Sequence, residues 1–237
     1  MSFKMGRLPA MFPAGLRELG YYAAGPLPKA PAKVAVPDVL QWEMLGNDQY
    51  GDCGVAGLEH GFMADANVVK EAETFPTDAQ AVSYYLAYTG GKDTGVVLSQ
   101  YLAHVRQSGY YGHKVTAYAP VGVHDIPTLQ TAINLYDFAY TGIAVTEEMQ
   151  QNFADGQPWT LESLLSPVEG GHCIPLVGYD DQYLYAVTWG SVQAITYPAW
   201  HYMSSEAWAV ITGELDKGDG RGVNYAALTA DLDKLAA

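Results

Sequence analysis

The chain has 237 residues, 49% of them apolar and 16% charged, which supports a large buried core and argues against intrinsic disorder. Twenty-six acidic residues against 12 basic ones give a net charge of −14, which disfavours nucleic acid and anionic membranes as partners. No apolar run reaches the ~18 residues of a membrane-spanning helix, and the N-terminus lacks the apolar core of a signal peptide. Two cysteines cannot form a disulfide framework, so a cytoplasmic protein is expected.

The N-terminal segment, residues 1–37, is dense in residues that interrupt regular structure. It holds six prolines and four glycines, which prevent any long helix and allow at most a turn over residues 14–19. We therefore predict an extended, proline-rich arm that precedes one main domain over residues 38–237. Such an arm packs on its own domain or on a neighbouring copy, so self-assembly through the arm is one expectation.

Helical periodicity dominates the first part of the main domain, residues 38–112. Apolar residues at helical spacing predict a helix over 53–72 without an internal proline. A capping-box pattern opens a second helix over 77–88, and a third is predicted over 94–107 with Gly109 as its stop. We expect this part to form a mainly helical lobe.

The second part, residues 113–237, reads mainly as β-structure, so the predicted fold class is α+β. Its one predicted helix covers 125–135, with a proline in the first turn. A hairpin turn is expected over 179–182. The predicted strands cover residues 114–121, 140–145, 173–179, 183–189, 194–197 and 208–212.

Cys53 and His172 are the candidate catalytic pair. Cys53 follows the polar, glycine-containing turn 46–52 and stands at the start of the first predicted helix. Backbone N–H groups and the helix dipole stabilise a thiolate at such a position. His172 lies on a predicted strand of the second half. A cysteine nucleophile assisted by a histidine base is the chemistry that these two residue types support.

This layout resembles the papain-like cysteine peptidases over about residues 36–212. Residues 171–179 read Gly-His-Cys-Ile-Pro-Leu-Val-Gly-Tyr, which is similar to the histidine strand of that family, and 36–42 resembles the start of its mature enzymes. The resemblance implies a two-lobed fold, with a helical N-terminal lobe and an antiparallel β-sheet or barrel in the C-terminal lobe. The arm would occupy the place of a propeptide.

The resemblance also implies roles for residues around the pair. Six positions before Cys53 the family has a glutamine that stabilises the oxyanion; here Asn47 stands there, and Gln49 is two residues further on. Either amide is expected to serve, together with the Cys53 backbone N–H. The family places an asparagine after the histidine to orient it, and Thr188 holds that position here. Its hydroxyl can hydrogen-bond His172.

Four residues are expected to contact the substrate or shield the pair. Trp189 would pack over the contact between histidine and threonine, and Gly171 directly precedes the histidine. Gly90 and Gly91 resemble the paired glycines whose backbone binds an extended substrate. Cys173, next on the strand, should point away from the imidazole into a second layer. We expect no cofactor and no metal, since the two cysteines and the histidine have no fourth ligand.

The implied function is hydrolysis of peptide or related amide bonds in a peptide or protein substrate. The alternative is a papain-like module without catalysis that serves binding or assembly, for example in a phage virion. The alternative gains weight from the altered residues at positions 47 and 188 and from the arm. The residue motifs around Cys53 and Trp189 resemble those of a little-characterised papain-like group in bacteria and their phages. The expected location is therefore cytoplasmic or virion-associated.

Overall fold

The computed structural model describes residues 3–69, 74–213 and 220–236, which contain one six-stranded antiparallel sheet. The strand order is β1-β6-β2-β3-β4-β5. With β1 and β5 at its two edges, the sheet is not closed, so of the two expected forms the sheet is observed and the barrel is not. The strands are β1 (Val115–Val121), β2 (Ala139–Thr146), β3 (Val168–Tyr179), β4 (Tyr183–Thr188), β5 (Ser191–Thr196) and β6 (Ser204–Thr212).

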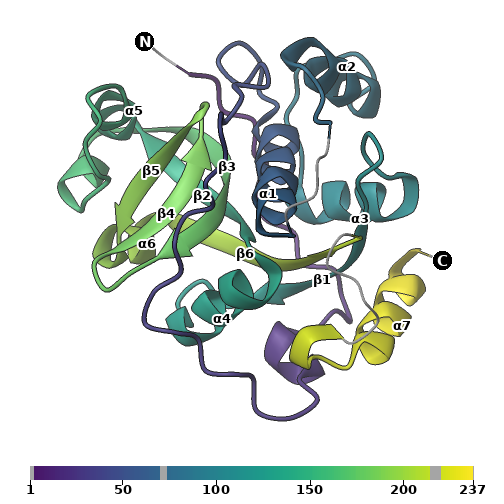
Figure 1. The fold of residues 1–237 in the computed structure, drawn as a ribbon. Helices are drawn as coiled ribbons and strands as arrows, with labels where there is room; N and C mark the ends of the chain where they lie inside the picture. The colour runs from purple at the N-terminus through teal and green to yellow at the C-terminus, as the bar shows by residue number, and fades with distance from the viewer. Residues whose placement is uncertain (1–2, 70–73, 214–219, 237) are drawn as a thin grey trace.

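Three helices precede the sheet and four follow its first strand, which confirms the α+β class (Figure 1). The first three gather on one side of the sheet, and α1 packs against β3. Within the described residues, every helix falls short of the length and apolar character that a bilayer span requires. The helices are α1 (Cys53–Val69), α2 (Asp78–Tyr88), α3 (Leu98–Ser108), α4 (Ile126–Tyr136), α5 (Glu147–Ala154), α6 (Tyr197–Met203) and α7 (Tyr225–Ala236).

A glycine face on α1 lets the sheet come close to the helix axis. A Cβ added at Gly57 would lie 3.0 Å from the Cys173 sulfur on β3. One added at Gly61 would lie 2.4 Å from the ring of Phe138, which is fully buried. Helices and sheets otherwise keep the distance that their side chains set. The absence of side chains at Gly57 and Gly61 therefore allows α1 to pack closely against the sheet.

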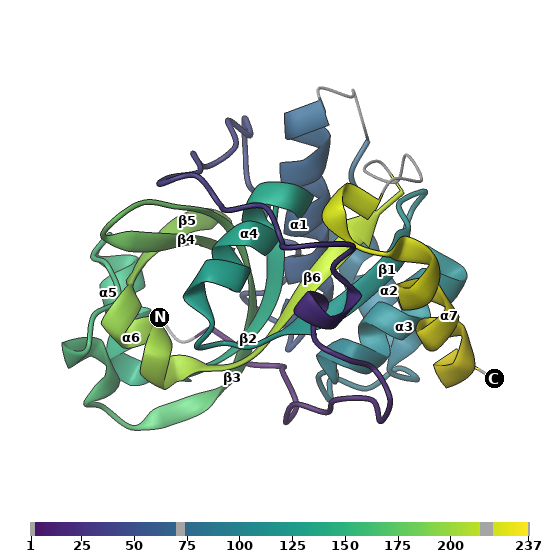
Figure 2. The same ribbon diagram turned by 90° about the horizontal axis from the view of Figure 1, so that it is seen from below.

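The N-terminal arm is extended, as predicted, and runs around the sheet rather than away from it (Figure 2). Its one regular turn is a 3-10 helix at Leu19–Tyr22, slightly later than expected. Beyond this turn, Ala23 forms an isolated antiparallel bridge with Val223, and Val34 forms another with Tyr179 at the end of β3. Backbone pairing at separated points thus fixes the path of a segment that has little regular structure.

Helix α3 begins at Leu98, four residues later than the predicted start at Thr94. Gly95 has a φ of +74°, which interrupts a helix. The next residue, Val96, forms an isolated parallel bridge with Arg7 of the arm. Residues 94–97 are therefore held by pairing with a distant segment instead of starting the helix. The local periodicity of the sequence does not indicate such pairing.

Helices α5, α6 and α7 have no counterpart among the predicted elements, and each follows a residue that caps it. The Thr146 hydroxyl accepts a hydrogen bond from the Met149 N–H at 3.3 Å at the start of α5. Asn224 does the same for the Ala227 N–H at 3.1 Å before α7. These helices are short, so their formation depends more on their caps and packing than on a long periodic pattern of apolar residues.

Candidate active site

Cys53 is the first residue of α1 and is fully buried. Gly46, with a φ of +82°, turns the chain before the helix. The Asp52 carbonyl then accepts hydrogen bonds from the N–H groups of Val55 at 2.7 Å and Ala56 at 3.1 Å, which begins the helix. Burial raises the pKa of the Cys53 thiol to about 12, and the Asp52 carboxylate adds to this. The Cys53 side chain is therefore a neutral thiol.

His172 lies on β3 and contacts the two residues expected beside it. Its Nε2 is 2.7 Å from the Thr188 Oγ1, and the two rings of His172 and Trp189 stack with centroids 4.7 Å apart and planes 23° apart. Within the described part of the chain, its Nδ1 has no hydrogen-bond partner. Burial lowers the pKa of His172 to about 3, and the charges of Arg7 and His60 act in the same direction. The imidazole is therefore neutral.

A tight hairpin places Trp189 over the imidazole. Thr188 at the end of β4 pairs with Ser191 at the start of β5, so Trp189 and Gly190 alone make the turn. Their φ values are +45° and +74°, as a two-residue hairpin turn of the I′ kind requires. Positive φ is unfavourable for tryptophan, so the stacked ring contacts have to hold it there. The hairpin fixes the threonine and the tryptophan as one unit beside His172.

The arm bridges the helical half and the sheet at this site. The Arg7 N–H donates to the Gly171 carbonyl at 3.0 Å, and the Leu8 N–H donates to the Val96 carbonyl at 2.9 Å. Val96 N–H in turn donates to the Gly6 carbonyl at 2.8 Å. A Cβ at Gly171 would lie 2.4 Å from the Arg7 carbonyl oxygen, so the close approach depends on this glycine. The Gly6 N–H also lowers the pKa of the Cys53 thiol.

Phe3 packs on Trp189, the residue that stacks on His172. Its ring stacks on Trp189, with centroids 4.4 Å apart and planes 11° apart, and meets Phe153 edge-on at 5.6 Å. The Phe3 N–H donates to the Gln150 Oε1 at 2.6 Å. His172, Trp189 and Phe3 thus form a stack of three rings. We call residues 3–8 the cover segment, because Phe3 packs on Trp189, the Gly6 N–H meets the Cys53 thiol and Arg7 pairs with Gly171.

The two amides expected to stabilise an oxyanion are engaged elsewhere. The Nδ2 of Asn47 donates to the Asp52 Oδ1 at 3.0 Å and to the Tyr50 carbonyl at 3.4 Å, and this side chain is buried. Gln49 is exposed, with its amide 3.4 Å from the Asp48 carboxylate. The Cys53 backbone N–H at the helix start is the remaining donor of the expected set. Burial raises the pKa of Asp52 to about 7, and the Asn47 hydrogen bond opposes this.

The paired glycines lie after α2, with open space around them. Gly90 and Gly91 follow α2 with φ values of +68° and +81°, and a Cβ at either would meet nothing within 4 Å. The extended chain at the site pairs instead with residues 95–96. A Cβ at Gly95 would lie 2.1 Å from the Gly6 carbonyl oxygen, which explains why a glycine precedes the pairing residue. Substrate binding by Gly90 and Gly91 stays a prediction.

Cys173 packs against the helix layer. Its sulfur lies against Gly57 of α1, the helix that begins with Cys53. The Tyr140 hydroxyl lies beside it, and burial raises the pKa of its thiol well above the ordinary value. Cys173 therefore packs at the junction of helix and sheet. In residues 3–69, 74–213 and 220–236, no group of three or more His, Cys, Asp or Glu could hold a metal ion.

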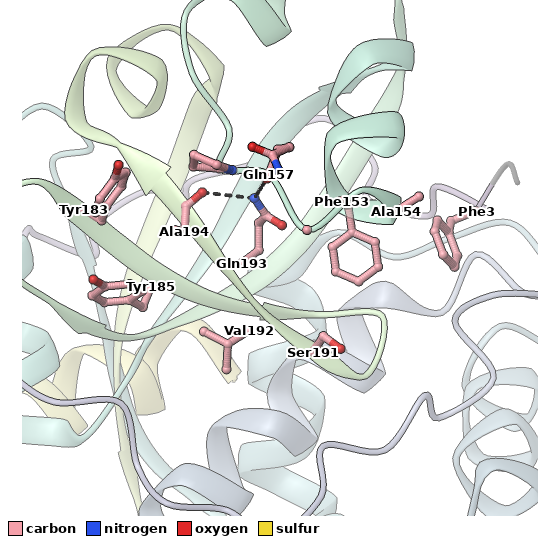
Figure 3. A pocket seen from close by; sticks show the side chains of 12 residues that line it. Phe3, Phe153, Ala154, Gln157, Tyr183, Tyr185, Ser191, Val192, Gln193 and Ala194 are labelled. Atoms are coloured by element: carbon pink, nitrogen blue, oxygen red, sulfur yellow. Dashed lines mark hydrogen bonds between the residues drawn. The ribbon is translucent and has the colours of Figure 1, made fainter.

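A cavity of about 710 Å³ lies between α5 and the β4–β5 hairpin (Figure 3). Phe3 and Phe153 stand at one end of it, and Tyr183 lies toward the other. The Gln193 amide donates to the carbonyls of Gln157 at 2.9 Å and Ala194 at 3.0 Å within its wall. Neither Cys53 nor His172 lines this cavity. Of the cover segment, Phe3 lines it.

Sequence reasoning missed the residues of the arm and their partners. Gly6 and Arg7 lie in a segment whose composition indicated only that it is extended. Glu206, which pairs with Arg7 at 3.1 Å, lies before the last predicted strand. The sequence offers one signal, Gly6 followed by the cation Arg7 in the arm. This signal does not identify Glu206, about 200 residues away, as the partner.

Comparisons with known structures identify the fold. The chain is similar to xylellain, a cysteine protease from Xylella fastidiosa, with a TM-score of 0.67 and 15% identity over 87% of this chain and 95% of that one. It is also similar to digestive procathepsin L 3 of the Tenebrio molitor larval midgut, with a TM-score of 0.55 and 13% identity over 84% and 74% of the chains. No protein-family model and no curated protein sequence matches the chain. The fold is papain-like, as the sequence predicts.

Proposed function

We propose that this chain is a latent cysteine hydrolase that acts on peptide or related amide bonds, with Cys53 as nucleophile and His172 as base. The observation that carries the proposal is the 2.7 Å contact between His172 Nε2 and Thr188 Oγ1, under the stacked Trp189. A hydroxyl partner orients the imidazole, and its Nδ1, which has no hydrogen-bond partner among the described residues, is the nitrogen that would take the thiol proton. Latency follows from the cover segment.

The reaction would proceed through a thioester. His172 takes the thiol proton as the Cys53 sulfur attacks the carbonyl carbon, and it returns that proton to the leaving amine when the carbon–nitrogen bond breaks. Water then attacks the thioester with His172 as base, which releases a carboxylic acid and restores the thiol. The Cys53 backbone N–H supports the oxyanion in both steps, and one well-placed donor contributes about 3 to 4 kcal/mol.

The cover segment explains why both groups are neutral in the structure. Burial raises the pKa of the cysteine and lowers that of the histidine, so the thiolate–imidazolium pair is disfavoured while residues 3–8 are in place. Removing the segment would expose both groups to water and relieve both shifts. Displacement of the segment is therefore the activating step in this proposal.

The second candidate is a papain-like module without catalysis, used for binding or assembly, for example in a phage virion. It is favoured by the Asn47 amide, which donates to Asp52 rather than toward the nucleophile. The arm, which pairs with several elements of the domain, also suits a structural role. The two candidates differ in one measurable property, the reactivity of Cys53 once the segment is displaced.

The test measures that reactivity in a variant with a displaced segment. Gly6→Ala serves for this, since its Cβ would lie 1.7 Å from the Gly51 carbonyl oxygen. In this background we compare iodoacetamide labelling of Cys53 and hydrolysis of a fluorogenic peptide library for His172→Ala and for the exposed control His201→Ala. We expect His172→Ala alone to abolish hydrolysis and to slow the labelling of Cys53 to the rate of free cysteine. If Cys53 reacts no faster than free cysteine in every protein, the non-catalytic candidate holds.

A further inference from the structure

Two exposed histidines from different elements lie against each other at the protein surface. The rings of His124 and His201 have centroids 4.2 Å apart and planes 37° apart. His124 lies in the loop between β1 and α4, and His201 lies in the last turn of α6. Both side chains are exposed, and neither belongs to the candidate active site. The fold therefore brings two imidazoles together where solvent reaches them.

The backbone beneath each imidazole is held by contacts of its neighbours. The Nε1 of Trp200, which is fully buried, donates to the Val123 carbonyl at 2.8 Å. These two residues directly precede the two histidines in the chain, so this hydrogen bond ties the loop to α6. The Asp125 carboxylate, which follows in the loop, accepts the Thr128 N–H at 3.2 Å and caps α4. The fold thus sets the spacing of the two imidazoles, and only their side-chain torsions are free.

The nitrogens of both rings are available to a ligand. Among the residues that the structure describes, neither His124 nor His201 forms a hydrogen bond or an ion pair. Their ring contacts are with each other and, for His201, edge-on with Tyr202 at 5.1 Å. A neutral imidazole has one nitrogen with a free lone pair, which makes histidine the commonest metal ligand in proteins. The two rings therefore offer two such lone pairs with no competing partner in the described part of the chain.

The spacing of the rings suits one metal ion. Bonds of about 2.0 to 2.1 Å to each nitrogen and a tetrahedral angle place the two nitrogens about 3.4 Å apart. Rings with centroids 4.2 Å apart reach this separation by rotation about their side-chain torsions, which exposed residues change readily. Because the backbone already holds the rings together, the second imidazole binds at a high effective concentration once the first has bound. The two histidines therefore act as a chelate rather than as separate ligands.

Imidazole nitrogens select the kind of ion. They suit Cu²⁺, Ni²⁺ and Zn²⁺, whereas Mg²⁺ and Ca²⁺ require oxygen ligands. The protein supplies two ligands, since within the described ranges no group of three or more His, Cys, Asp or Glu could hold a metal ion. Water is expected in the remaining positions. The net charge of −14 raises the concentration of divalent cations near the surface, which favours binding further.

We propose that His124 and His201 form a surface site for one divalent transition-metal ion, such as Cu²⁺, Ni²⁺ or Zn²⁺, which links the β1–α4 loop to α6. The prediction that the chain holds no metal was drawn from the two cysteines and His172, and these residues lie outside this site. Neither surface histidine takes part in the proposed hydrolysis. The metal site and the hydrolase function can therefore fail separately.

The test measures metal binding to the full-length protein by equilibrium dialysis against Ni²⁺. We expect one bound ion per chain in the wild type. His124→Ala and His201→Ala should each weaken binding about a hundredfold, because the remaining imidazole binds as a single ligand. His104→Ala is the control, since its ring is only partly exposed and packs beside Tyr88 at 4.8 Å. This control should bind Ni²⁺ as the wild type does.

A second measurement identifies the ligand atoms. The electron paramagnetic resonance spectrum of bound Cu²⁺ should show coupling to two nitrogen nuclei in the wild type, and to at most one in each alanine variant. His124→Gln and His201→Gln keep a polar side chain of similar size and should lose binding to the same extent. These variants serve if an alanine variant does not fold.

Three results would overturn the proposal. One is Ni²⁺ binding of wild-type strength in His124→Ala or His201→Ala. Another is equal binding of Mg²⁺ and Ni²⁺, which would mean that the negative surface alone attracts the ion. The third is one ion for every two chains, which would place histidines of two copies around the ion instead of the two of one chain.

Discussion

Replacing Gly6 with alanine should open the protein without unfolding it. The added Cβ would lie 1.7 Å from the Gly51 carbonyl oxygen and 2.2 Å from its carbon, and neither atom belongs to a flexible side chain. The cover segment would have to leave its position, with the loss of three backbone hydrogen bonds to Val96 and Gly171. At about 1 kcal/mol each, the loss is about 3 kcal/mol, which raises the open fraction by about a hundredfold.

The assay is iodoacetamide labelling of the native protein, with the label located by peptide mass spectrometry. Cys53 should be labelled about a hundred times faster in Gly6→Ala than in the wild type, since its exposure is limited by opening. Gly20→Ala is the matched control on the same arm, because a Cβ there meets nothing within 4 Å. Its labelling rate should equal that of the wild type.

Two outcomes would refute this reasoning. If Gly6→Ala unfolds cooperatively at the wild-type Tm and labels at the wild-type rate, the segment does not hold Cys53 in a closed state. If Cys53 and Cys173 become reactive together with a loss of cooperative unfolding, the substitution acts on the whole fold.

Three further predictions concern the base, a buried acid and the glycine face. With the arm displaced, Thr188→Val should lower kcat/KM roughly tenfold through the lost hydrogen bond to His172, while Thr188→Asn should retain activity; equal rates for both would exclude a positioning role. Burial raises the pKa of Glu59 from 4.5 to about 8, so its stabilising effect is complete below pH 4.5 and lost as pH rises through 8. Glu59→Gln should therefore flatten the fall in Tm between pH 5 and 9, and an unchanged slope would contradict this. Gly61→Ala should destabilise the fold by about 1 to 3 kcal/mol in urea unfolding, because its Cβ would meet Phe138 at 2.4 Å; a gain in stability would mean that helix propensity outweighs the clash.

Sequence patterns predicted the helices and strands that depend on contacts between residues close to one another in the chain. The predicted helix 77–88 has its expected cap, with the Thr77 N–H donating to the Gln80 Oε1 at 2.9 Å. The alternation in the second half located all six strands of the sheet, with ends shifted by a few residues. The start of α3 could not be predicted in this way, because Val96 is held by Arg7 from the far end of the chain.

The residues of the candidate site also differ in how far the sequence could predict them. The spacing of Cys53, His172 and Thr188 reflects the order of helix, strand and hairpin, so sequence resemblance could place these residues. The engagement of Asn47 with Asp52 depends on a carboxylate buried five residues away, and no pattern indicates whether an amide faces its neighbour or a substrate. The path of the arm was equally hidden, since proline density shows that a segment is extended but not what it contacts.

The covalent link between the cover segment and the domain sets how strongly it competes with other peptides. A segment tethered to its own binding position acts at an effective concentration in the millimolar range, whatever the concentration of the protein. A cut in the arm between Leu8 and Val34 would change this, because the freed piece would dilute to the concentration of the protein itself. At micromolar protein that dilution is about a thousandfold, so a single cut would make opening practically irreversible without altering any contact in the domain.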